Sequence, residues 1–127
     1  MAILKRFGRD GNNMLKFAIK NAYYDGKTVG YLYYDEQQRE YEIEIPETVK
    51  SCEAPPIISD FIKKNQSRIG KEWSYRWVSQ RVTPPERQNI GQILKANHMT
   101  EYDEFQFLLK NGGRSCQDEC YIVKVDG

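Results

Sequence analysis

Two cysteines near the C-terminal end of the chain, Cys116 and Cys120, come closest to a chemical motif by type and spacing. A thiolate pair four residues apart could ligate zinc, but the site would need at least two further ligands. Cys52 and the only histidine, His98, belong to no paired-ligand spacing, and a histidine at an expected helix end commonly caps backbone carbonyls. We therefore interpret the thiols as structural and predict no metal and no cofactor.

A cysteine nucleophile is the second chemistry that these residues could supply. A reactive thiolate needs an electropositive surrounding, but Asp118 and Glu119 stand between the two cysteines in "CQDEC". Adjacent acids would point to opposite faces of a strand and make a poor acid/base pair. We interpret them as part of a solvated loop and predict that the chain is not an enzyme. A small thiol or metal-dependent enzyme centred on Cys116, Cys120 and His98 remains the alternative.

A group of tryptophans and arginines in "KEWSYRWVSQRV", residues 71–82, indicates binding rather than catalysis. Trp73 and Trp77 are four apart, which would place both indoles on one face of a helix. Rigid aromatic side chains and arginines supply most of the energy of protein interfaces. We predict that Trp73, Arg76, Trp77 and Arg81 bind a partner, although aromatic pairs at helical spacing are about as often part of the core.

The charge balance, 19 basic against 18 acidic side chains, argues against nucleic acid or a membrane as the partner. Basic side chains nevertheless gather in residues 61–95, as on a protein-facing surface or a solvated face. A nucleic-acid-associated or phage-borne accessory protein remains an alternative. Short apolar runs, no secretion signal in the first 20 residues and an odd number of cysteines predict a cytoplasmic protein with reduced thiols.

The strands that must position these residues are indicated by turn and alternation patterns. Residues 14–34 predict a β-hairpin, with Asp25-Gly26 as a two-residue type I′ turn. "REYEIEIP", residues 39–46, alternates apolar and acidic side chains and predicts a strand with one wet face. "CYIVKV", residues 120–125, predicts the closing strand.

Helices are predicted between the third and the last strand. A helical apolar period begins at Pro55 and runs through Ile69, and a second helix covers residues 71–82 beyond Gly70. Thr83 and Glu86 form a capping box for a third helix, with Pro84 at its first position. Three apolar residues of that helix are expected to face inward: Ile90, Ile93 and Leu94.

The last predicted helix follows a second start signal, Thr100 with Asp103, and ends at Gly112. Its apolar stripe comprises Tyr102, Phe105, Leu108 and Leu109. Together these patterns predict a single α+β domain over residues 1–127. An antiparallel sheet of the N-terminal hairpin, the third strand and the C-terminal strand is packed by three to four helices, and residues 1–13 could form a flexible extension.

The order of these features resembles the N-terminal subdomain of HipA-type toxin kinases and its stand-alone HipS-like counterpart in HipBST toxin–antitoxin systems. The matching residues are the aromatic helix Trp73 to Val82, Pro84-Pro85, Arg87, Asp103 with Phe105, Leu108 and Leu109, Gly113-Arg114 and Tyr121-Ile122-Val123. The hairpin "AYYDGKTVGYLYYD" is similar to the opening of that family. The resemblance covers most of residues 17–125 and is most specific in 73–125.

The resemblance implies a bacterial, cytoplasmic, non-catalytic protein-binding module, because the matched part includes none of the kinase lobe. Such a module would act as an antitoxin-type regulator that docks on and restrains a HipA/HipT-like serine/threonine kinase. A helix-turn-helix protein of the same operon is a further implied partner. Arg87, which stands at the arginine of the family pattern, joins the predicted partner-binding residues.

Overall fold

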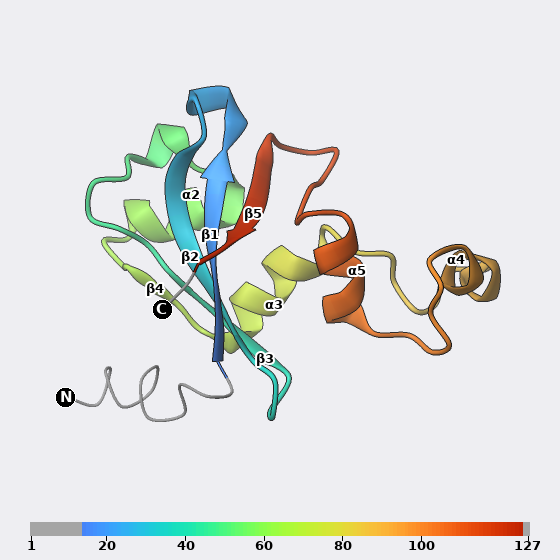
Figure 1. Ribbon diagram of the computed structural model, residues 1–127. Coiled ribbons are helices and arrows are strands. Elements are labelled where there is room, and N and C mark those ends of the chain that lie inside the picture. The colour runs from blue at the N-terminus through green and yellow to red at the C-terminus, as the bar shows by residue number, and fades with distance from the viewer. Residues whose placement is uncertain (1–13, 126–127) are drawn as a thin grey trace.

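A five-stranded antiparallel sheet is the centre of the computed structural model, which describes residues 14–125. Its strands follow the order β4-β3-β2-β1-β5 (Figure 1). Their bounds are β1 Met14–Asn21, β2 Lys27–Asp35, β3 Glu40–Glu44, β4 Arg68–Ile69 and β5 Cys120–Lys124. The predicted hairpin, third strand and closing strand are thus confirmed, and the closing strand pairs with β1. Residues 1–13, the predicted extension, lie outside the described residues.

The connection between β1 and β2 is longer than predicted. Asn21 pairs with Lys27, so residues 22–26 form the turn, and a short 3-10 helix, η2 Ala22–Tyr24, occupies its first half. Asp25 and Gly26 both adopt positive φ angles, 57° and 74°, as the Asp-Gly signal required. The two-residue turn was wrong because the Asn21 side chain accepts a hydrogen bond from the Tyr23 N–H and begins the 3-10 turn earlier.

The two faces of the sheet differ as the alternating pattern predicted. The inward face packs against α2, α3 and α5, with Leu32 between Phe17 on β1 and Ile43 on β3. The opposite face carries tyrosines between charged residues. Tyr33, for example, pairs with Lys16 and Glu42, and its hydroxyl donates to Glu44 at 3.1 Å. The apolar core therefore lies between one face of the sheet and the helices.

Four α-helices follow β3: α2 Pro56–Lys63, α3 Lys71–Ser79, α4 Ile90–Ala96 and α5 Glu104–Lys110. The first is shorter than predicted, because after Lys63 the chain turns at Asn65, which has φ 59°, and Ile69 joins the sheet in β4 opposite Ile43. A 3-10 helix, η3 Ser51–Glu53, precedes α2. With α2, α3 and α5 packed on one face of the sheet, the α+β fold is confirmed.

The predicted capping box at Thr83 was wrong. Residues 84–90 make two successive turns, in which the Arg87 N–H donates to the Pro84 carbonyl at 3.2 Å and the Ile90 N–H to the Arg87 carbonyl at 3.0 Å, and α4 begins only at Ile90. The α4 helix has no buried residue, so Ile90 and its apolar neighbours do not face the core as predicted, and Figure 1 shows α4 standing away from the sheet. A capping box pairs only the backbone N–H groups of the first turn. Without an apolar face packed against the core, the chain gains little by extending that turn into a longer helix.

The start signal at Thr100 was wrong: α5 begins only at Glu104, and Tyr102 lies before the helix rather than in its apolar stripe. Asp103 is the N-cap, and its carboxylate accepts hydrogen bonds from the N–H groups of Phe105 and Gln106. Phe105 and Leu108 are buried, whereas Leu109, which was expected in the same stripe, is 40% exposed. Among residues 14–125, no helix is long and apolar enough to cross a membrane.

Two glycines end α5, and they differ in a way that allows a matched test. Both have positive φ angles, 68° at Gly112 and 71° at Gly113. A Cβ added at Gly113 would lie 2.8 and 2.9 Å from the side-chain carbons of Ile122, whereas one at Gly112 would meet nothing closer than 3.8 Å. An alanine at either position would therefore strain the backbone, but only the one at Gly113 would also collide with Ile122.

We expect Gly113→Ala to lower the free energy of unfolding by about 1–3 kcal/mol more than Gly112→Ala, because only the former overpacks the contact with β5. Urea unfolding of the two variants, monitored by circular dichroism, measures the difference. Equal losses in the two proteins would contradict the close approach of Gly113 to Ile122.

Candidate protein-binding surface

The α3 helix carries four of the five residues predicted to bind a partner, on its body or just beyond its end. Gly70 precedes the helix, and the buried Ser74 hydroxyl donates to the Ile69 carbonyl at 2.9 Å, which joins the first turn to β4. Trp77 and Val78 are almost fully buried against the sheet. The inward side of α3 is thus fixed by packing and by a hydrogen bond.

Arg81, two residues beyond α3, forms a buried ion pair with Asp118, just before β5. Its guanidinium nitrogens lie 2.7 and 3.3 Å from the two carboxylate oxygens, and its guanidinium carbon lies 3.8 Å from the centroid of the Trp77 ring. The same carboxylate accepts the Cys120 N–H at 2.9 Å. The side chain of Asn111, the C-cap of α5, donates to the Arg81 carbonyl. This cluster therefore joins the ends of α3 and α5 to the start of β5.

These contacts change three of the sequence-based interpretations. Trp77 is 1% and Arg81 4% exposed, so neither side chain is available on the surface to anchor a partner. Trp73 and Trp77 lie four apart on α3 as predicted, but Trp73 is 46% exposed, so the two indoles belong neither to the core together nor to the surface together. Asp118 is not part of a solvated loop, because the buried guanidinium draws its carboxylate inward. Glu119 remains exposed.

The outer side of α3 presents the remaining predicted residues. The Arg76 guanidinium stacks on the Trp73 ring at 4.8 Å and lies 3.6 Å from the Glu72 carboxylate. Tyr75, which the sequence analysis did not single out, is 50% exposed on the other flank of the helix. Arg87 is exposed between α3 and α4, where it joins two successive turns, and its role stays a prediction.

A group of tyrosines surrounds Glu104 at the start of α5. The phenol groups of Tyr41 and Tyr75 approach the half-buried Glu104 carboxylate. Burial raises the pKa of Glu104, and the two phenols partly oppose the shift. Burial also raises the pKa of Tyr102 to about 12, with the charge of Glu104 as the next cause. A carboxyl with a raised pKa is a candidate general acid, but two phenols already engage this one, so we interpret it as a brace between β3, α3 and α5.

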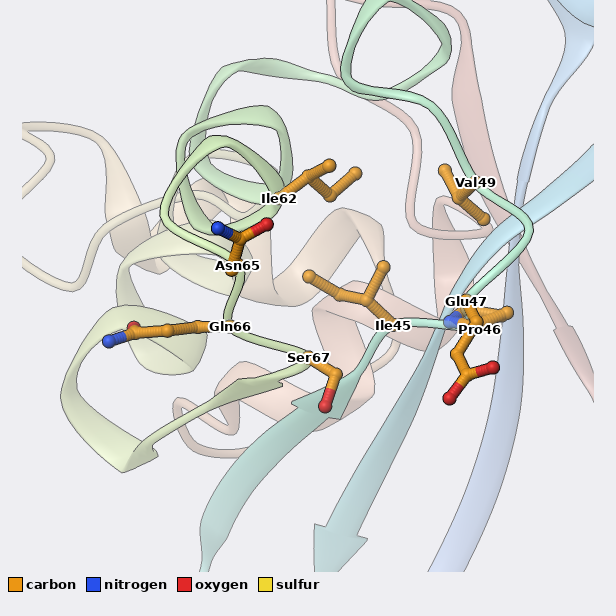
Figure 2. A pocket seen from close by; sticks show the side chains of 8 residues that line it. All are labelled: Ile45, Pro46, Glu47, Val49, Ile62, Asn65, Gln66 and Ser67. Atoms are coloured by element: carbon orange, nitrogen blue, oxygen red, sulfur yellow. The ribbon is translucent and has the colours of Figure 1, made fainter.

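Two hollows lie on the surface near these elements. One, of about 380 Å³ and mostly apolar, is lined by Arg39, Glu40, Tyr41, Lys71, Glu72 and Tyr75. The other, of about 320 Å³, is shown in Figure 2; apolar side chains of Ile45, Val49 and Ile62 meet the polar side chains of Glu47, Asn65, Gln66 and Ser67 there. The polar groups of this second hollow are exposed side chains on its rim. They support a specific binding site less strongly than the braced tyrosines of the first hollow do.

The cysteines and the histidine do not form a site within residues 14–125, where no group of three potential metal ligands occurs. Cys52 and Cys116 are exposed, and Cys120 is buried. Burial, with the charge of Asp118 as the next cause, raises the pKa of the Cys120 thiol to about 12, so this thiol stays protonated at neutral pH. His98 follows α4 with φ 60°, and its backbone N–H donates to the Lys95 carbonyl.

Comparison with protein-family models, with curated proteins and with solved structures finds no match for this chain. The candidate site therefore rests on the geometry of the described residues. Tyr75, Glu104 and Asp118 were missed because each is one polar residue whose partner lies far away in the sequence. No local pattern distinguishes such a residue from a solvated one.

The raised pKa values predict a loss of stability at alkaline pH. The pKa of Tyr33 is raised to about 12 by burial and then by the charge of Glu44, and that of Cys120 to about 12. An unfolded cysteine or tyrosine loses its proton near pH 9 or 10, whereas these folded groups keep theirs until about pH 12. Their stabilising contribution is therefore complete below about pH 9 and declines as the pH rises toward 12.

Free energies of unfolding measured by urea titration between about pH 8 and pH 11 test this expectation. Tyr33→Phe removes one of the titrating groups, so it should lose less stability across this window than the parent protein. Tyr23→Phe, at a 75% exposed site, is the matched control and should follow the parent. An unchanged pH profile for Tyr33→Phe would overturn the assignment.

Proposed function

We propose that this chain is a non-catalytic protein-binding module, an antitoxin-type regulator that docks on and restrains a HipA/HipT-like serine/threonine kinase. The binding role is supported by the exposure of two aromatic side chains on the outer side of α3: Trp73 is 46% and Tyr75 50% exposed. Large aromatic side chains on the surface of a small domain commonly mark contact sites. Arg76, stacked on Trp73, adds a planar donor to the same surface.

The rigidity of α3 supports this role. Ser74 and Trp77 fix the inward side of the helix, and Arg81 fixes its end through Asp118. A partner that binds the outer side does not have to order the helix first, which lowers the entropic cost of association. The exposed aromatic residues are therefore suited to act as pre-positioned anchors.

The identity of the partner rests on the resemblance of residues 73–125 to the HipA N-terminal subdomain and to HipS-like proteins. In such a system the module works in the bacterial cytoplasm, beside its kinase and a small helix-turn-helix protein. Arg87 contacts the kinase together with α3 in this proposal. Regulation comes from occupancy of the kinase surface rather than from chemistry on this chain.

The two other classes of function have less support from the described residues. For nucleic acid, the basic side chains on and around α3 are already paired with carboxylates: Lys71 with Glu40, Arg76 with Glu72 and Arg81 with Asp118. For a thiol enzyme, the buried Cys120 lies beside Asp118, which disfavours a thiolate. A thiol enzyme would make no use of the exposed aromatic residues of α3.

The test begins with the genes beside the one that encodes this chain. A short HipA-like kinase encoded there is purified in an inactive form, and its binding to this chain is measured by isothermal titration calorimetry. We expect a stoichiometric complex, with Trp73→Ala weakening it by about 30-fold or more, as for a hot-spot residue worth about 2 kcal/mol. With active kinase, the parent chain should suppress autophosphorylation.

Tyr23→Ala is the matched control, because it removes an aromatic side chain that is even more exposed but lies on the turn after β1. It should bind like the parent. Absence of a HipA-like kinase among the neighbouring genes, or no binding to one that is present, would contradict the kinase as the partner. Equal losses for Trp73→Ala and Tyr23→Ala would contradict α3 as the contact surface.

A further inference from the structure

The apolar hollow beside α3 has the features of an anchor pocket for a single side chain. It lies between the turn after β2, the start of β3 and the first turns of α3, and its volume is about 380 Å³. This is near the lower end of the roughly 300–1,000 Å³ of ligand pockets, which suits one large side chain better than a cofactor. Tyr41, 2% exposed, lies deepest among the lining residues, and the half-exposed Tyr75 lies nearer the solvent.

The tyrosines of this hollow are held in place before any ligand arrives. Both phenol groups approach the Glu104 carboxylate. Behind Tyr41 the Tyr34 ring lies 4.8 Å away, and Tyr34 in turn stacks on Phe105 at 4.0 Å. A preformed wall requires little side-chain ordering on binding, which favours affinity for a complementary group.

The charges around the hollow select what can enter. Lys71 lies 3.1 Å from Glu40, and Glu72 is engaged by Arg76 at 3.6 Å. Arg39, the remaining charged residue of the lining, has no ion pair within residues 14–125. Its backbone is fixed at φ 57° by a 2.7 Å hydrogen bond from its N–H to the Asp35 carbonyl. Among the described residues, the rim therefore presents the Arg39 guanidinium, outside any ion pair, next to an apolar interior.

We propose that this hollow, the Arg39–Tyr75 pocket, receives an aromatic or large aliphatic side chain of a partner protein that carries a carboxylate at the neighbouring position. The apolar side chain packs between Tyr41 and Tyr75, and the carboxylate pairs with the Arg39 guanidinium. The inference rests on the proposed protein-binding function and specifies the sequence chemistry of the segment that is bound. The pocket gives the partner a second contact with α3, on the flank of the helix that carries Tyr75.

Blocked dipeptides test the pocket without the whole partner. N-acetyl-Glu-Phe-amide, N-acetyl-Glu-Ala-amide and N-acetyl-Lys-Phe-amide are titrated into the full chain labelled with nitrogen-15, and amide shifts are followed by NMR. We expect Glu-Phe to shift the amides of Arg39, Tyr41 and Tyr75 with a dissociation constant of about 1 mM. Glu-Ala should bind at least about tenfold more weakly, and Lys-Phe should bind several-fold more weakly.

Two variants separate the roles of the lining residues. Arg39→Gln should remove the preference for Glu-Phe over Lys-Phe while leaving the preference of Phe over Ala. Tyr75→Ala should remove most binding of both Phe probes, and Tyr75→Phe, which keeps the ring, should retain it. The spectrum of each variant without probe shows that it is folded.

The proposal is overturned if Glu-Phe produces no shifts at about 10 mM, or if Glu-Ala binds as well as Glu-Phe. It is also overturned if the shifts fall on the hollow of Figure 2, or if sedimentation shows a dimer of the chain that Tyr75→Ala abolishes. These outcomes are independent of the kinase. Probe binding without kinase binding would contradict only the proposed partner, whereas kinase binding without probe binding would contradict only the pocket.

Discussion

The buried ion pair between Arg81 and Asp118 is the interaction on which the rest of the structure depends. A guanidinium with no exposed side-chain area is stable only where a carboxylate and further contacts compensate the loss of hydration. Asp118 supplies two hydrogen bonds, and the Trp77 ring supplies a stacked face. Because Asn111 also donates to the Arg81 carbonyl, the pair positions the ends of α3 and α5 against the start of β5. The orientation of any functional surface on α3 therefore depends on this cluster.

The position of α3 explains why the surface proposed for binding is aromatic. The helix is short, and its inward side is used by Ser74, Trp77 and Val78. Trp73 and Tyr75 therefore fall on its two flanks, where about half of each side chain stays in solvent. On the Tyr75 flank, Glu104 connects the helix to β3 and α5. One side of α3 stabilises the fold, and the other offers rigid apolar area to a partner.

Local signals in the sequence predicted the sheet better than the helices and the site. The positive φ angles of Asp25 and Gly26 and the alternation in β3 depend on neighbouring residues alone, so the sequence predicted them, although the length of the turn and the N-cap of α5 were predicted wrongly. The two-residue strand β4 was missed because its pairing with β3 is set by the tertiary fold. The pair of Arg81 and Asp118 spans 37 residues, and no spacing rule connects them. Trp77 was open to two interpretations for the same reason: helical spacing places a residue on a face but does not say what covers that face.

A double-mutant cycle on Arg81 and Asp118 tests the central claim most directly. Arg81→Met, Asp118→Leu and the combined variant are unfolded in urea. We expect each single change to lower the free energy of unfolding by about 3 kcal/mol or more, since it leaves one buried charge alone. The double variant should lose well under the sum of the two. Losses that add to within about 0.5 kcal/mol would mean that the two residues do not act together, and the proposed basis for the orientation of α3 would be contradicted.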